Sequence, residues 1–230
     1  MTTVLSASAR SEPTLQMSSN VAWNGIPFAA NPSWPDPLQP HADHLAIRVL
    51  RQSEALKLRR IGIAAPRNQK SETSLTSLLL QGFRHLEGTK VFAFDLNTGS
   101  NGFTAFLARK AVPAQTNKQM TTASFRLAPN LAVSQIADPA ISSMSCLTSY
   151  ATLDEIDQID AEFQPDLMLF DLPALLDHPD ALAAAPMLDG LLICVPSDVT
   201  TERDLSMCRD RFEGILPIIG SVLTESRGMI

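Results

Sequence analysis

Five short apolar runs constrain the fold of this chain more than any other feature. They end at or just before a polar or turn residue and occupy 61–65, 91–94, 166–170, 191–195 and 218–223. Apolar runs without polar alternation are typical of strands that are buried on both faces of a parallel sheet. The pattern therefore predicts an α/β protein whose central strands are covered by helices on both sides.

Helical periodicity separates these runs. The segments 43–60, 73–88, 153–163, 181–187 and 201–212 carry apolar residues at helical spacing. The order strand, helix, strand predicts right-handed βαβ units and hence a mostly parallel central sheet. Residues 110–150 show no readable periodicity, so we predict no element there.

The first 42 residues differ in composition from the rest. They are rich in Ser, Thr and Ala and then in proline, with Trp23, Phe28 and Trp34 interleaved. Dense proline prevents regular helix and sheet. We expect residues 1–42 to form an extended, partly disordered arm that packs on the domain or on a partner, and residues 43–230 to form one domain.

Composition excludes several functional classes. The net charge is −6, and the only basic cluster is Lys57, Arg59 and Arg60, so a broad nucleic-acid footprint is not expected. The three cysteines are widely spaced and suit a reducing compartment. No apolar stretch approaches the ~18 residues of a membrane span. We therefore expect a cytoplasmic protein, recruited to the inner membrane by a partner if it acts there.

The C-terminal half carries a resemblance. It reads PDLMLFDLP at 165–173, LDGLLICV at 188–195, TTERDL at 200–205 and ILPIIGSVL at 215–223. In order, spacing and context this resembles the cytoplasmic domain of bacterial tyrosine kinases (BY-kinases), a branch of the MinD/ParA-like P-loop ATPases. The resemblance implies a three-layer P-loop NTPase-like fold with helices on both faces. It also implies a role in exopolysaccharide or capsule synthesis beside a membrane polysaccharide co-polymerase.

The resemblance assigns roles to four residues. Asp171 matches the Walker B aspartate and Asp95 the aspartate that follows the second strand, so both would surround Mg²⁺ if it binds. The family usually has a second carboxylate two residues after the latter, and here Asn97 replaces it. Arg48 and Arg51 match the two arginines of a helix that the family uses in ring assembly, which also allows a homo-oligomer.

The phosphate-binding loop departs most from the family. A gapless alignment places Gln69, Lys70, Ser71, Glu72 and Thr73 at the Gly-x-Gly-Lys-Ser/Thr positions. Both glycines are missing, and Glu72 replaces the lysine that bridges phosphates. One like-charge pair at about 4 Å costs ~4 kcal/mol at an effective dielectric of 20. Only the Thr73 hydroxyl survives as a metal ligand, and we expect no nucleotide cofactor.

Three residues in or beside this loop leave alternatives open. In a shifted alignment, Lys70 and Ser71 take the Lys-Ser positions, although glycine is still missing. Arg67 lies where MinD/ParA-like proteins keep an intersubunit lysine, and we interpret it instead as a solvated loop arginine. Further along, residues 177–180 read as a loop with a helix cap.

The C-terminal end departs as well. Thr224 stands where the family often has an adenine-reading asparagine. No tyrosine cluster follows it, and Tyr150 is the only tyrosine in the chain.

The sequence therefore favours a catalytically impaired BY-kinase-like protein with a regulatory or scaffolding role. The first alternative is an active kinase or ATPase that uses ATP and Mg²⁺ through an atypical loop. A MinD/ParA-like positioning protein ranks lower, because the net charge argues against DNA.

Overall fold

A seven-stranded sheet forms the centre of the computed structural model, which describes residues 26, 28–29, 39–68, 74–97, 103, 122–136, 147–177 and 179–224. The strands are β1 (Arg60–Ala64), β2 (Val91–Asp95), β3 (Thr122–Ala128), β4 (Leu131–Ile136), β5 (Leu167–Asp171), β6 (Gly190–Pro196) and β7 (Ile218–Thr224). The helices are α1 (Gln39–Leu56), α2 (Leu75–Phe83), α5 (Tyr150–Phe163), α6 (Asp180–Ala184) and α7 (Glu202–Phe212), and a 3-10 turn (Ala185–Met187) follows α6.

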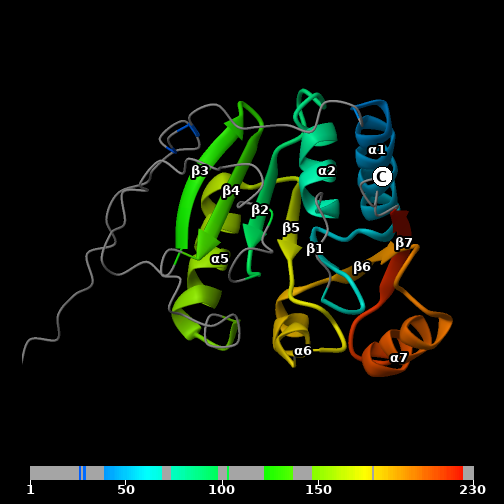
Figure 1. Cartoon of the computed structure of the whole chain (residues 1–230). Coiled ribbons are helices and arrows are strands. Elements are labelled where there is room, and N and C mark those ends of the chain that lie inside the picture. Colours follow the sequence, from blue (N-terminus) through cyan, green and yellow to red (C-terminus); the bar gives the residue numbers. More distant parts are fainter. Residues whose placement is uncertain are drawn as a thin grey trace, which may run out of the picture.

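The strand order is β3-β4-β2-β5-β1-β6-β7, with every neighbouring pair parallel except β3 and β4 (Figure 1). The five predicted strands are all present. β3 and β4 form a hairpin within 110–150, where we predicted no element. Their register shifts between Arg126 and Ala128, which adds to the irregularity of that segment.

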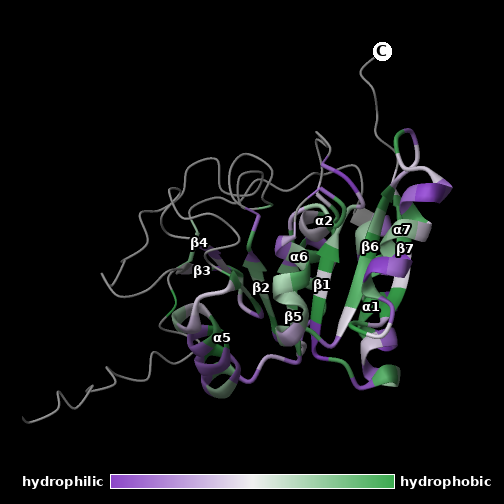
Figure 2. Cartoon of the chain, turned by 90° about the horizontal axis from the view of Figure 1, so that it is seen from below, coloured by the Kyte–Doolittle hydropathy of each residue, from purple (hydrophilic) through white to green (hydrophobic). Residues whose placement is uncertain are grey.

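Two hydrophobic clusters lie on opposite faces of the sheet. In one cluster the strands pack against α1 and α2, through residues such as Val49, Leu79 and Phe83. The other unites them with α5, α6 and α7 through residues such as Ile159 and Phe212. Figure 2 shows β1 and β6 as green strands between these helices. The predicted three-layer arrangement with a mostly parallel sheet is therefore confirmed.

Helix α1 lies four residues earlier than the predicted segment 43–60. Pro40 falls in its first turn, where a missing backbone N–H costs nothing, so the helix begins within the proline-rich stretch. At the other end Lys57 adopts a left-handed conformation with φ 57°, which stops the helix. The predicted boundary between the arm and the domain stays a prediction.

Helix α2 is shorter than the predicted segment 73–88. Ser74 caps its start by accepting a hydrogen bond from the Thr76 N–H. Beyond Phe83 the chain turns, and the side-chain amide of Asn130 donates to the carbonyls of Phe83, Leu86 and Thr89. That amide satisfies carbonyls that a longer helix would have used.

Close packing of α1 on α2 depends on a glycine. A Cβ at Gly82 would lie 2.2 Å from the Ala42 carbonyl oxygen and 2.8 Å from the Ala46 Cβ. Only glycine lets the two helices approach this far. The contact fixes α2, whose first turn carries part of the site described below.

Besides residues 39–42, which belong to α1, the structure describes Ile26, Phe28 and Ala29 of the arm, and these three lie against β3. The Ala29 N–H donates to the Arg126 carbonyl at 2.8 Å, and the Arg126 Nε donates to the Ile26 carbonyl at 3.1 Å. The Phe28 ring lies under the same guanidinium, 4.0 Å from ring centroid to Cζ. Phe28 also forms an isolated parallel bridge with Arg126, so this part of the arm covers the β3 edge of the sheet.

Candidate functional site

Two aspartates meet at the carboxyl edge of the sheet. Asp95 is the last residue of β2 and Asp171 the last residue of β5, and the register pairs them directly across the two strands. Asp95 is 4% exposed and Asp171 is 7% exposed. The resemblance implied that both aspartates surround one site, and they meet because the carboxyl ends of parallel strands share one edge.

A buried threonine joins this pair. The Thr76 hydroxyl, in the first turn of α2, donates to Oδ1 of Asp171 at 2.5 Å, and Thr76 has no exposed surface. Sequence alignment placed the relevant hydroxyl at Thr73, which lies outside the described residues. The sequence signal for Thr76 was weak, because α2 also contains the polar residues Ser77 and Gln81, and the gapless alignment assigned the hydroxyl to Thr73.

The Asp171 carboxyl has an acidic environment. Burial, and then the charge of Asp95, raise the pKa of Asp171 well above its ordinary value. Hydrogen bonds from the Thr76 hydroxyl and the Phe103 backbone N–H act in the opposite direction. Among the described residues, no cation contributes to this shift. The centre of the site therefore binds a proton or a cation more readily than an anion.

Oxygen ligands of this kind fit Mg²⁺. Asp171 and Asp95 supply carboxylate oxygens and Thr76 a hydroxyl, the hard donors that Mg²⁺ prefers. Asn97, which replaces the family's second carboxylate, donates its backbone N–H to Oδ1 of Asp95 at 3.3 Å. Within the described part of the chain no group of three or more His, Cys, Asp or Glu side chains is placed to hold a metal. The donor set thus fits a weakly held Mg²⁺ that keeps several waters.

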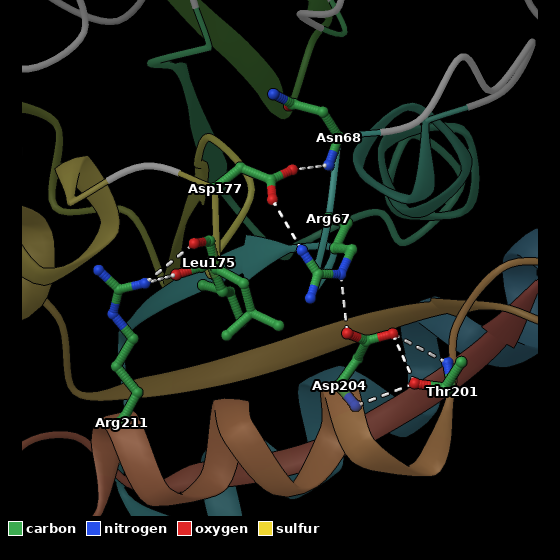
Figure 3. Close-up of polar contacts among 8 residues, drawn as sticks. Arg67, Asn68, Leu175, Asp177, Thr201, Asp204 and Arg211 are labelled. Carbon is green, nitrogen blue, oxygen red and sulfur yellow. Dashed lines mark hydrogen bonds and ion pairs between the residues drawn. The ribbon is translucent and has the colours of Figure 1, made fainter.

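Arg67, just beyond β1, has two carboxylate partners (Figure 3). Its Nε donates to Oδ1 of Asp204 at 2.8 Å, and its Nη1 donates to Oδ1 of Asp177 at 3.3 Å. Asp177 also accepts the Asn68 backbone N–H at 2.6 Å. Arg67 is a loop arginine with a side chain that is 48% exposed, as expected, and it is also paired with two aspartates. Its two bonds connect the start of the phosphate-loop segment to Asp177, before α6, and to Asp204, in the first turn of α7.

The Asp204 carboxylate is held from several sides. It lies in the capping box of α7, where it accepts the hydroxyl and the backbone N–H of Thr201. These bonds, and then the bond from Arg67, lower the pKa of Asp204. Residues 177–180 were interpreted as a loop with a helix cap, and α6 begins at Asp180 with its N-cap at Pro179, inside that segment. Pro179 makes no side-chain cap bond, and Asp177 accepts hydrogen bonds from Arg67 and Asn68.

The degenerate phosphate loop itself is not described. Gln69, Lys70, Ser71, Glu72 and Thr73 all lie outside the described residues. Their predicted roles, and the shifted alignment through Lys70 and Ser71, stay predictions.

Thr224 ends β7 and lies three strands from Asp171 in the sheet. Its carbonyl accepts the Ser197 N–H at 2.9 Å, and its hydroxyl lies 3.6 Å from the Cys194 Sγ. Burial is the main cause that raises the pKa of the Cys194 thiol. The structure does not bring Thr224 against the aspartate pair, and its predicted adenine-side role stays a prediction.

Arg48 and Arg51 lie exposed on α1, away from the carboxyl edge. Neither makes an ion pair with another described residue. Leu45, at the family's glutamate position, is partly buried and packs into the cluster between α1, α2 and the sheet. Both arginines are thus placed for an intermolecular contact, and their role in assembly stays a prediction.

Two members of the basic cluster, Arg59 and Arg60, are paired with carboxylates at the opposite, amino edge of the sheet. Arg59 binds Asp160 at 2.7 Å, and Arg60 binds Asp157 at 2.8 Å and Asp160 at 2.7 Å. The backbone N–H groups of both arginines donate to Asp189. These bonds join β1 to α5 and offset the charge of both arginines. Within the described residues no helix is long and apolar enough to cross a membrane.

Comparison with known proteins establishes the fold. No family model matches the chain, and no curated protein sequence matches it. The kinase domain of the Escherichia coli tyrosine kinase ETK aligns with a TM-score of 0.63 and 14% identity, covering 96% of this chain and 87% of that one. The BceF tyrosine kinase domain aligns with a TM-score of 0.60 and 16% identity, covering 81% and 76%. The VpsO kinase domain aligns with a TM-score of 0.60 and 11% identity, covering 81% and 95%. The predicted P-loop NTPase-like fold is therefore confirmed.

Proposed function

We propose that this chain is a catalytically impaired BY-kinase-like protein that serves as a regulatory or scaffolding partner in bacterial exopolysaccharide or capsule synthesis and export. The observation that carries the proposal is the acidic centre at the carboxyl edge. Asp171 and Asp95 lie there buried and side by side, and no described cation acts on Asp171.

Nucleotide phosphates would meet repulsion at this edge. A phosphate chain needs backbone N–H groups or fixed cations to offset its charge. Arg67, the described arginine at the start of the loop, is already bound to Asp177 and Asp204. The sequence adds Glu72 at the lysine position. The described residues thus fit a metal ion better than the phosphates of ATP.

The alternative, an active ATPase or tyrosine kinase, draws on a different observation. Thr76, Asp95 and Asp171 retain the oxygen donors that hold Mg²⁺ in P-loop ATPases. When bound there, Mg²⁺ would neutralise phosphate oxygens. This alternative then needs a cation from Lys70 or a rearranged Arg67 to replace the missing lysine.

ATP turnover separates the two functions. The full chain is incubated with ATP and Mg²⁺, and phosphate release is compared with that of Asp171→Asn and of Tyr150→Phe as a surface control. We expect release at the rate of the buffer in all three proteins. Turnover by the wild type that disappears in Asp171→Asn and persists in Tyr150→Phe would establish the active alternative.

The resemblance to BY-kinases suggests which protein this chain binds, and a binding assay tests it. We propose that a membrane polysaccharide co-polymerase, or another protein of the same machinery, recruits this chain to the inner membrane. The cytoplasmic segment of the co-polymerase from the same genome, immobilised, should retain the full chain both with and without ATP. Failure to retain it under either condition would contradict the scaffolding role, and retention only with ATP would favour the active alternative.

A further inference from the structure

The two edges of the sheet differ. At one end β3 is covered by Ile26, Phe28 and Ala29 of the arm. At the other end, beside α7 (Figure 2), no described segment pairs with the outer side of β7. Natural sheets usually blunt an open edge with charge, proline or a bulge that turns it away. β7 reads IIGSVLT, without charge or proline. Its register against β6 shifts between Ile218 and Gly220, so the regular and open part of this edge is 220–224.

We propose that β7 pairs antiparallel with β7 of a second copy of this chain, about a two-fold axis at Ser221, so that one sheet continues across the dimer. This interface is separate from the arginines of α1 and does not depend on the proposed function. Three independent features of β7 support it.

The first feature is the direction of the backbone. The Thr224 carbonyl accepts the Ser197 N–H, so Thr224 directs its backbone groups toward the β6 side. Backbone groups alternate sides along a strand, and those of Ser221 and Leu223 therefore point outward. A two-fold axis at Ser221 makes Ser221 and its copy a hydrogen-bonded pair, and the hydroxyls meet across the axis.

The second feature is a protruding side chain beside a groove. Ile218, Ser221 and Leu223 pair with Leu191, Ile193 and Val195 of β6, which pack against α5, α6 and α7. These three β7 side chains therefore point to the α7 face, where Leu223 is 70% exposed. On the same face a groove of about 720 Å³ opens beside the start of β7. Its apolar lining includes Ile193, Phe212, Ile215, Leu216, Pro217 and Ile218.

Antiparallel pairing fits these two parts together. With the axis at Ser221, Leu223 of one copy lies level with Ile219 of the other, where the register of β7 shifts. Ile219 packs on the α1 face, so on the α7 face Leu223 lies next to Ile218 and the mouth of the groove. The symmetry repeats this contact, so each copy contributes one leucine and one groove. The interface is self-complementary without any charged pair.

The third feature is Gly220. Glycine weakens a strand and often marks a place where another chain approaches closely. Inside this subunit nothing requires it, because a Cβ at Gly220 would meet only the Leu192 Cδ1 at 3.7 Å, and its φ is not in the left-handed region. In the proposed dimer Gly220 lies opposite Val222 of the second copy, so the missing side chain makes room for a β-branched one.

Light scattering and sedimentation of the full chain test the assembly. We expect a dimer, and we expect Leu223→Lys to raise its dissociation constant at least about 100-fold, since two leucines lose their burial. Tyr150→Lys, an exposed position on α5 at 84% exposure, is the matched control and should remain a dimer. Circular dichroism confirms that both variants are folded. A monomeric wild type, or a dimer that Leu223→Lys does not weaken, would overturn the proposal.

Oxidative crosslinking tests the register. Residues opposite each other in a hydrogen-bonded pair have Cα atoms about 5.5 Å apart, within disulfide range. Ser221→Cys should therefore form a covalent dimer. Leu223→Cys is the control, because its copy would lie four residues away, about 13 Å along the strands. The wild type, which retains Cys146, Cys194 and Cys208, gives the background. Equal crosslinking of both variants, or none by Ser221→Cys, would refute the axis at Ser221.

Discussion

Asp171→Asn is expected to stabilise the fold at neutral pH, although it removes a charge that the sequence assigns to a functional site. Burial and the charge of Asp95 raise the pKa of Asp171, so ionising it in the folded protein costs free energy. The two residues are register partners on adjacent strands. At the usual strand spacing of about 4.8 Å, two full charges repel by about 3 kcal/mol at an effective dielectric of 20.

The amide retains most of the packing. Asn has nearly the same volume as Asp, and its oxygen still accepts the Thr76 hydroxyl. Its NH₂ group suits the Phe103 N–H less well than a carboxylate does, at a cost of about 1 kcal/mol. We therefore expect a net gain of about 1 to 3 kcal/mol, or about 2 to 10 °C in Tm for a chain of this length.

Denaturation in urea with EDTA, from pH 4 to pH 8, measures the effect. The folded pKa of Asp171 is raised, so its stabilising contribution is complete below the ordinary value of 3.8 and is lost as pH rises through the folded pKa. The advantage of Asp171→Asn should thus be largest at neutral pH and should shrink toward pH 4. Asp95→Asn should add little to Asp171→Asn, because one repulsion cannot be removed twice. Destabilisation by Asp171→Asn at neutral pH, or an effect independent of pH, would refute this reasoning.

Four other perturbations have defined outcomes. Gly82→Ala should lower the free energy of unfolding by about 1 to 3 kcal/mol, because its methyl group meets the Ala42 carbonyl; equal urea midpoints would contradict the tight helix contact. Asp204→Asn should lower Tm at neutral pH, and the Tm difference from the wild type should disappear as pH falls through the depressed folded pKa of Asp204. Arg67→Gln should lower Tm less at high salt than at low salt, because salt screens its ion pairs. A loss of Tm that does not change with salt would argue against the ion pairs. Burial raises the pKa of the Cys208 thiol to about 11. Cys208 should therefore react with iodoacetamide at pH 8 far more slowly in the folded chain than in urea, as followed by mass spectrometry. Equal rates in the two conditions would show that the thiol is accessible in the folded chain.

The buried strands were predictable because their signal is local. Runs such as 91–94 and 191–195 are apolar throughout, and that pattern is readable without knowing which strands or helices pack beside them. The hairpin of β3 and β4 was not predictable in the same way. Its strand Thr122–Ala128 mixes Thr, Ser and Arg with apolar residues, and the buried Arg126 contacts Ile26 and Phe28, which are about 100 residues away in sequence.

Some residues of the candidate site were predictable from the sequence and others were not. Asp95 and Asp171 were predictable, because each follows a buried strand and parallel strands bring their ends together. Thr76 was not, since its role depends on where α2 begins and not on residue spacing alone. The partners of Arg67 were hidden as well, because Asp177 and Asp204 lie 110 and 137 residues away in sequence.

Calorimetric titration of ATP into the full chain, with Mg²⁺ at the same concentration in cell and syringe, tests the central claim most directly. The acidic centre and Glu72 predict no heat beyond that of dilution, both for the wild type and for Asp171→Asn. Glu72→Lys, which restores the family's cation, should bind more tightly than the wild type. Saturable binding of ATP by the wild type that Asp171→Asn abolishes would contradict the claim and would show that the loop holds phosphates without its glycines and lysine.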